Sequence, residues 1–105
     1  MIDNEIKLRD KNMAYAEARH ILVASEDECN ALKTEIQNGA DFADVAAKNS
    51  QCPSGANGGD LGRFTPGQMV PEFDEAVFRG GDVGELQGPI QTQFGFHLLE
   101  VTARG

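Results

Sequence analysis

Basic residues are scarce in this chain, and long apolar runs are missing. Its 105 residues include nine Lys and Arg against 17 Asp and Glu, which gives a net charge of −8. A nucleic-acid binder normally carries a basic stripe that neutralises phosphates, and an anionic membrane attracts the same charge. No segment approaches the ~18 consecutive apolar residues of a membrane-spanning helix. We therefore expect neither nucleic acid nor a membrane as a partner.

Cysteine is also rare, since the chain holds only Cys29 and Cys52. The first residues show neither the basic region nor the apolar core of a secretion signal, which predicts a cytoplasmic protein with free thiols. The length predicts one domain that buries a single core without disulfides. We assign residues 1–13 to an N-terminal extension or tail and residues 14–105 to the domain, with Met13 as an alternative natural start.

The first half of the chain predicts one strand followed by two helices. Residues 18–23 alternate polar and aliphatic side chains, as a short strand does. Ser25 begins a capping-box pattern for a helix that ends at Asn38-Gly39, and Asp41 is the expected cap of a second helix. The apolar residues expected to face inward from these helices are Cys29, Leu32, Ile36, Phe42, Val45 and Ala46.

Ten of the 12 glycines lie between Gly55 and Gly95, and this part of the chain predicts more loop than regular structure. Breaker residues indicate loops at 50–62 and 84–90, and a short strand at 62–64 lies between them. A third helix is expected at 70–79, with a proline in its first turn. A second clear strand follows at 95–101. This order is typical of an α+β fold with an antiparallel sheet.

Metal and nucleotide chemistry lack the residue spacing that they need. The two Cys and two His could supply four zinc ligands, but no two of them lie close enough for one turn to hold a metal. The glycine run at 55–62 lacks the Gly-Lys-Ser/Thr ending of a phosphate-binding loop. We therefore expect no metal and no cofactor.

A thiolate–imidazole pair of Cys52 with His20 or His97 is the sharpest enzymatic interpretation of the residue types alone. Against it, the chain is short for a cysteine protease, and strand histidines and cysteines are more often core residues. Four apolar residues are open to two interpretations, as core or as the lining of a cavity mouth, and spacing alone favours core. They are Leu61, Met69, Phe73 and Phe94.

Six motifs follow one another between residues 18 and 101. They are His20-Ile21-Leu22-Val23, Asn38-Gly39-Ala40-Asp41-Phe42, Ser50-Gln51-Cys52-Pro53-Ser54-Gly55, Gly58-Gly59-Asp60-Leu61-Gly62, Gly67-Gln68-Met69-Val70-Pro71-Glu72-Phe73, and Gly88-Pro89-Ile90 with Thr92-Gln93-Phe94-Gly95-Phe96-His97. In this order they resemble the parvulin family of peptidyl-prolyl cis/trans isomerases, and most of all its small single-domain bacterial members.

The resemblance implies a βα3βαβ2 fold, in which helices surround a four-stranded antiparallel sheet, and an enzyme that isomerises X-Pro bonds. His20 and His97 match the paired histidines of the family, and Thr92 matches a hydroxyl that ties them into a network. Cys52 matches a position that is Cys or Asp in relatives. The residues implied to bind substrate are Leu61, Met69, Phe73, Phe94 and Gln68.

The family divides over the charge of its substrates. Members that act on phosphoserine or phosphothreonine carry a basic cluster after the first strand, whereas here Ala24-Ser25 leads straight into Glu26-Asp27-Glu28. Three carboxylates repel a phosphate dianion. We therefore expect the substrates to be unphosphorylated proline-containing segments of unfolded or flexible proteins. The resemblance implies that the enzyme acts on them without covalent attack. We also expect the protein to be a monomer. A non-catalytic chaperone module and a thiol hydrolase are the alternatives.

Overall fold

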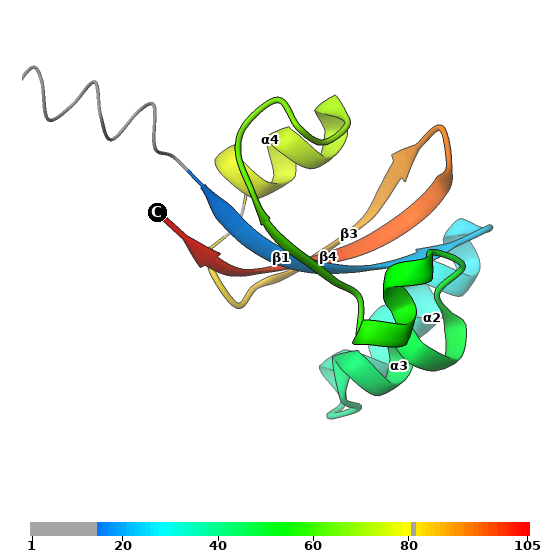
Figure 1. The fold of residues 1–105 in the computed structure, drawn as a ribbon. Helices are drawn as coiled ribbons and strands as arrows, with labels where there is room; N and C mark the ends of the chain where they lie inside the picture. The colour runs from blue at the N-terminus through cyan, green and yellow to red at the C-terminus, as the bar shows by residue number, and fades with distance from the viewer. Residues whose placement is uncertain (1–14, 81) are drawn as a thin grey trace, which may run out of the picture.

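Residues 15–80 and 82–105 are described by the structure, a computed structural model (Figure 1). The predicted extension at 1–13 lies outside these residues, and within them no helix is both long enough and apolar enough to cross a membrane. The elements in chain order are β1 (Ala16–Val23), α2 (Glu26–Gln37), α3 (Phe42–Asn49), the 3-10 helix η1 (Pro53–Asn57), β2 (Asp60–Phe64), α4 (Pro71–Arg79), β3 (Leu86–Thr92) and β4 (Gly95–Arg104).

The four strands form one antiparallel sheet in the order β2-β1-β4-β3, which confirms the α+β class and the parvulin arrangement. The register of the two central strands places Leu22 opposite His97 and His20 opposite Leu99. Paired residues share a face of the sheet, and side chains alternate along each strand. His20 and His97 therefore point to the same face from adjacent central strands.

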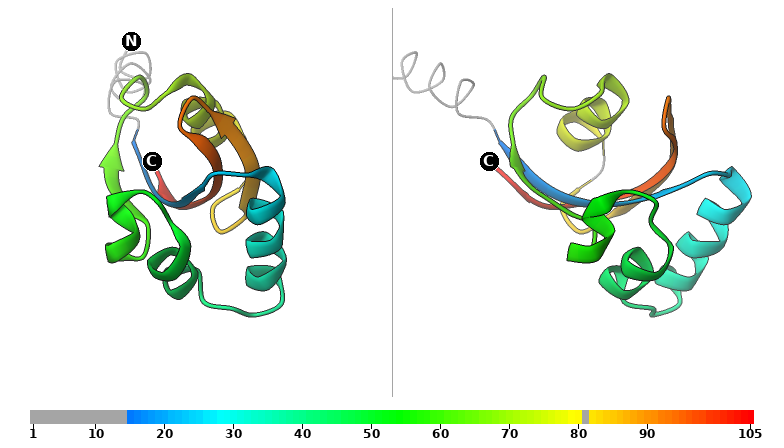
Figure 2. Two further views of the ribbon diagram at one scale, coloured as in Figure 1. Left: turned by 90° about the vertical axis from the view of Figure 1, so that its right-hand side faces the viewer. Right: turned by 45° about the vertical axis from the view of Figure 1, so that its right-hand side comes forward.

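Helices cover both faces of this sheet (Figures 1 and 2). On one face, Ile21 and Leu98 pack against α2 and α3. On the other face, Leu99 and Val101 belong to the cluster that includes Phe73 and Val77 of α4. Burial of each such side chain contributes about 1.5–3 kcal/mol. The histidines thus lie on the α4 face.

Both predicted N-caps are present at the first two helices. The Ser25 hydroxyl accepts the N–H of Glu28 at 3.1 Å, and the Asp41 carboxylate accepts the N–H of Asp44 at 3.1 Å. Each such cap contributes ~1 kcal/mol to helix stability. Because side-chain caps and apolar stripes are local patterns, the prediction of α2, α3 and their buried faces is confirmed.

The prediction of two loops was wrong in part. The segment 50–62 contains η1 and the beginning of β2, and 84–90 contains most of β3. At Gly59, a Cβ atom would collide with the carbonyl of His20, and at Gly88 (φ +130°) it would lie 2.5 Å from the carbonyl of His97. These glycines let the chain pass close to a neighbouring strand. Gly88 lies within β3, and Gly59, directly before β2, accepts the N–H of His20 at 2.9 Å, so neither glycine interrupts the sheet.

Candidate active site

A cavity of about 350 Å³ opens on the α4 face of the sheet. Strands supply its floor through His20, Leu22, Leu61 and His97. The surrounding loops, η1 and α4 supply its walls through Gln51, Cys52, Pro53, Met69, Val70, Phe73 and Phe94. None of these lining residues is an Asp, Glu, Lys or Arg. The cavity therefore offers a largely apolar surface without formal charge.

Phe73 connects the floor of the cavity to α4. The helix begins at Pro71, and the N–H of Phe73 donates to the Val70 carbonyl at 2.9 Å. The ring meets His97 edge-on at 4.6 Å and His20 edge-on at 5.4 Å between centroids. Only 4% of Phe73 is exposed, so the same ring belongs to the core and to the cavity.

The two histidines form the middle of a hydrogen-bonded chain. Their Nδ1 atoms lie 3.1 Å apart, which requires one ring to donate and the other to accept. His20 Nε2 contacts the Ser54 hydroxyl at 3.1 Å, and His97 Nε2 contacts the Thr92 hydroxyl at 2.7 Å. The Phe94 N–H donates to the same Thr92 oxygen at 3.1 Å. All four ring nitrogens therefore have partners within the protein.

Burial keeps this pair uncharged. Desolvation lowers the pKa of His97 from 6.5 to about 4, and desolvation together with the neighbouring His97 lowers the pKa of His20 to about 4. Both rings are thus neutral at pH 7. A buried neutral pair whose nitrogens are all engaged is a rigid floor for a ligand rather than a proton donor.

A family model described as "Rotamase: PPIC-type PPIASE domain" matches residues 7–103. The chain belongs to this family. It is a parvulin-type peptidyl-prolyl cis/trans isomerase domain, and the resemblance in the sequence motifs is confirmed.

Relatives of the isomerase include longer foldases and chaperones. It is 44% identical over 104 residues to the foldase protein PrsA of Exiguobacterium sibiricum, with 97% of this chain and 34% of the relative covered. It is 42% identical over 105 residues to the chaperone SurA of Methylococcus capsulatus, with 90% and 23% covered. The chain thus spans about a third or less of these relatives.

Solved structures share the fold as well. The PrsA peptidylprolyl isomerase from Bacillus anthracis superposes with a TM-score of 0.85 at 34% identity, covering 96% of this chain and 46% of that one. NmPin, the parvulin of Nitrosopumilus maritimus, has a TM-score of 0.76 at 33% identity, covering 85% and 96%.

Seven of the predicted site residues line the cavity of the isomerase: His20, Cys52, Leu61, Met69, Phe73, Phe94 and His97. Thr92 lies beside it and holds His97. Gln68 is not among the lining residues, because its side-chain oxygen accepts the Thr65 N–H at 2.7 Å within the turn before α4. The arrangement thus gathers the predicted set, with Gln68 as the exception.

Sequence reasoning missed Ser54, which partners His20, and four lining residues. Leu22 follows His20 by two positions, so strand alternation alone places both on one face. The side chain of the exposed Gln51 lines the cavity and has no hydrogen-bond partner among the described residues. The other two lining residues are Pro53 and Val70.

Cys52 lines the cavity from a segment that Ser50 links to the sheet through hydrogen bonds. The Ser50 hydroxyl accepts the N–H of Leu22 at 3.1 Å and the N–H of Cys52 at 3.3 Å. Both cysteines are free thiols. Among the residues that the structure describes, no group of three or more His, Cys, Asp or Glu is placed to hold a metal ion.

Proposed function

We propose that this isomerase domain accelerates rotation about X-Pro bonds by holding the twisted amide non-covalently. Resonance keeps an amide planar, with a barrier of ~18–20 kcal/mol. The twisted amide has lost this resonance, and its carbonyl is less polar, so an apolar cavity favours it over both planar isomers. A site that binds the twisted form best lowers the barrier without breaking a bond.

One observation carries this proposal: an uncharged, apolar cavity lies above a histidine pair whose nitrogens are all engaged. Met69 and Phe73 would hold the pyrrolidine ring and leave the preceding carbonyl free to rotate. Neither histidine has a nitrogen free to exchange a proton with the substrate. Their role is then to keep the floor rigid before the substrate arrives, which is preorganisation.

Exchange spectroscopy on a short Ala-Pro peptide tests this function. With separate signals for the cis and trans forms, the exchange rate should rise in proportion to the protein added. The second candidate, a binding module without useful turnover, is suggested by relatives that are named chaperones. Peptide binding without faster exchange would favour that candidate.

The substitution Cys52→Asp is expected to keep isomerase activity within about tenfold of the wild type, a difference of ~1.4 kcal/mol. A carboxylate can replace a polar wall or a partial negative charge, but it is a poor substitute for a nucleophilic thiol. Covalent catalysis would instead lose several orders of magnitude with its nucleophile. Cys52→Ser, which is neutral, separates the effect of charge from that of size. Near-complete loss of exchange in a folded Cys52→Asp protein would contradict the non-covalent mechanism.

A peptide with phosphoserine before the proline should exchange about three- to tenfold more slowly than its unmodified twin, because like charges near a surface repel. No Lys or Arg among the described residues lines the cavity, and the short turn after β1 leads into Glu26, Asp27 and Glu28. The same pair of peptides measured with Glu26→Gln should differ less. Faster turnover of the phosphopeptide would contradict the proposed preference for uncharged residues before proline.

For the whole protein, we propose that the domain assists the folding of proline-containing chains. The names foldase and chaperone of its relatives support this role. We further propose that the domain is a monomer, which its sedimentation behaviour would test.

The cytoplasm is the compartment that sequence reasoning predicts, and this stays a proposal. One solved structure with a similar fold belongs to a pair of SurA-like chaperones of Campylobacter jejuni, PEB4 and a periplasmic protein. Fractionation of cells that express the native gene would decide between the two compartments.

A further inference from the structure

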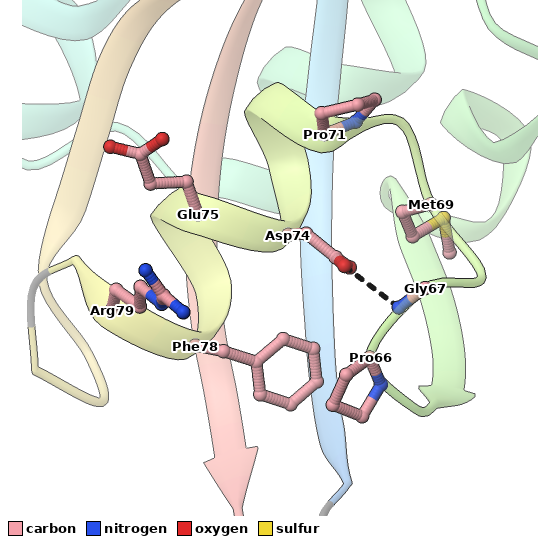
Figure 3. Close-up of a pocket in the computed structure, with 8 residues that line it drawn as sticks. All are labelled: Pro66, Gly67, Met69, Pro71, Asp74, Glu75, Phe78 and Arg79. Atoms are coloured by element: carbon pink, nitrogen blue, oxygen red, sulfur yellow. Dashed lines mark hydrogen bonds between the residues drawn. The ribbon is translucent and has the colours of Figure 1, made fainter.

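A groove of about 570 Å³ lies next to the cavity above the histidine pair, which we call the proline cavity. Met69 lines both, so a peptide whose proline fills the cavity can lay a neighbouring side chain into the groove. Figure 3 shows the groove between α4 and the turn that precedes it, with the rings of Pro66 and Phe78 among its lining residues. These rings provide apolar surface next to the proline cavity.

Asp74 links α4 to the turn that precedes it. One oxygen of its carboxylate accepts the N–H of Gly67 at 2.7 Å (Figure 3). The other oxygen is buried, and no described residue forms a hydrogen bond with it. Asp74 as a whole is half-buried, and a half-buried carboxylate with an unpaired oxygen is incompletely compensated. Its charge is also less screened by salt than that of an exposed side chain.

Two further charges line the groove, Glu75 and Arg79. Both are exposed and opposite in sign, so their fields largely cancel and are screened by solvent. Neither forms an ion pair with another described residue. With Glu75 and Arg79 offsetting each other, the half-buried Asp74 leaves the groove with a net negative charge.

We propose that this groove is a subsite for a Lys or Arg side chain of the client segment, close to the isomerised proline. Such side chains carry an aliphatic stem and a cationic end. The stem fits Pro66 and Phe78, and the cation is attracted by the net negative charge that Asp74 gives the groove. The subsite rests on the proposed isomerase function, because it needs a proline in the neighbouring cavity. It makes the domain selective for basic client segments.

Exchange measurements on matched peptides test the subsite. Starting from an alanine peptide with one Ala-Pro bond, Lys or Glu replaces Ala at each of the three positions before and after this bond. At one or two positions on one side, Lys should raise kcat/KM about three- to tenfold over Ala, and Glu should lower it. The difference should shrink in high salt, as expected for attraction between partly exposed charges.

Variants show whether the groove or the overall charge of −8 causes the preference. Asp74→Asn keeps an acceptor for Gly67 and should bring the Lys-to-Ala ratio close to one. Arg79→Gln should increase the ratio. The matched control is Glu35→Gln, which removes an exposed charge from α2 on the opposite face of the sheet and should leave the ratio unchanged.

The outcomes separate the two proposals. Absence of faster exchange with every peptide would overturn the isomerase function itself. Faster exchange with equal rates for Lys and Glu at all positions would overturn only the subsite. A ratio that falls as much in Glu35→Gln as in Asp74→Asn would also overturn it, because overall charge would then explain the preference.

Discussion

Replacing Phe73 with alanine is expected to remove most of the isomerase activity and to lower the free energy of unfolding by about 3–5 kcal/mol. The ring is 4% exposed, lines the proline cavity and meets both histidines edge-on. Its loss opens the cavity floor and leaves a void between α4 and the sheet. Domains of this size are stable by about 5–15 kcal/mol, so the stability effect is a large fraction of the total.

Val77→Ala is the matched control for this experiment. Val77 lies one turn further along α4, is fully buried in the same cluster, and does not line the cavity. It should destabilise by about 1–3 kcal/mol and keep its activity per folded molecule. Urea unfolding gives the folded fraction, and exchange spectroscopy gives the rate. If Phe73→Ala unfolds outright, Phe73→Leu keeps most of the core volume and should still lose activity. A fully active, folded Phe73→Leu protein would contradict the role of the aromatic ring in the cavity.

The helices of the fold could be predicted from local patterns because their determinants lie close together in the sequence. Ser25 and Asp41 bond to N–H groups three residues on, and Pro71 begins α4 where its missing donor costs nothing. None of these interactions depends on a distant strand.

The edge strands of the sheet were predicted only in part, because a strand was expected at residues 62–64 of β2 but a loop was expected over most of β3. Gly59 and Gly88 lie in glycine-rich segments whose composition is typical of loops. Each glycine is needed because the chain passes close to a carbonyl of another strand, that of His20 or His97. A glycine that breaks a strand and a glycine that admits a neighbouring strand look alike in one sequence. The structure distinguishes them because it supplies the neighbour.

The candidate site came from the resemblance in ordered motifs rather than from residue chemistry. Residue types alone left Cys52 with His20 or His97 as a possible thiolate pair. In the structure, the partner of each histidine is the other histidine and a hydroxyl, Ser54 or Thr92. Contacts of this kind join residues from separate elements, so neither spacing nor composition predicts them.

Mild acid is expected to destabilise the domain strongly through its buried histidines. Burial lowers the pKa of both His20 and His97 in the folded chain to about 4, whereas an unfolded chain keeps a value near 6.5. Between these values, the unfolded state binds protons that the folded state does not bind. The contribution of the pair is therefore complete above pH 6.5 and is lost as the pH falls toward 4.

The size of this effect follows from proton linkage. Each extra proton bound by the unfolded state changes the free energy of unfolding by ~1.4 kcal/mol per pH unit, so two histidines give a slope of roughly 2.7 kcal/mol per unit near pH 5. The shared Nδ1–Nδ1 contact strengthens the expectation, because it needs one unprotonated nitrogen and is broken when both rings are charged. Activity should stay constant from pH 8 to about 5, since both rings remain neutral there.

Two independent measurements test this prediction. Urea unfolding at a series of pH values gives the slope, and comparison with His20→Gln/His97→Gln separates the histidines from the many carboxylates of the chain. Should the double variant fail to fold, NMR titration of the ring carbons in the wild-type protein reports the two histidines directly. Rings that titrate near 6.5 in the folded protein would contradict the prediction, because an accessible pair could not serve as a neutral, rigid floor for the proline cavity.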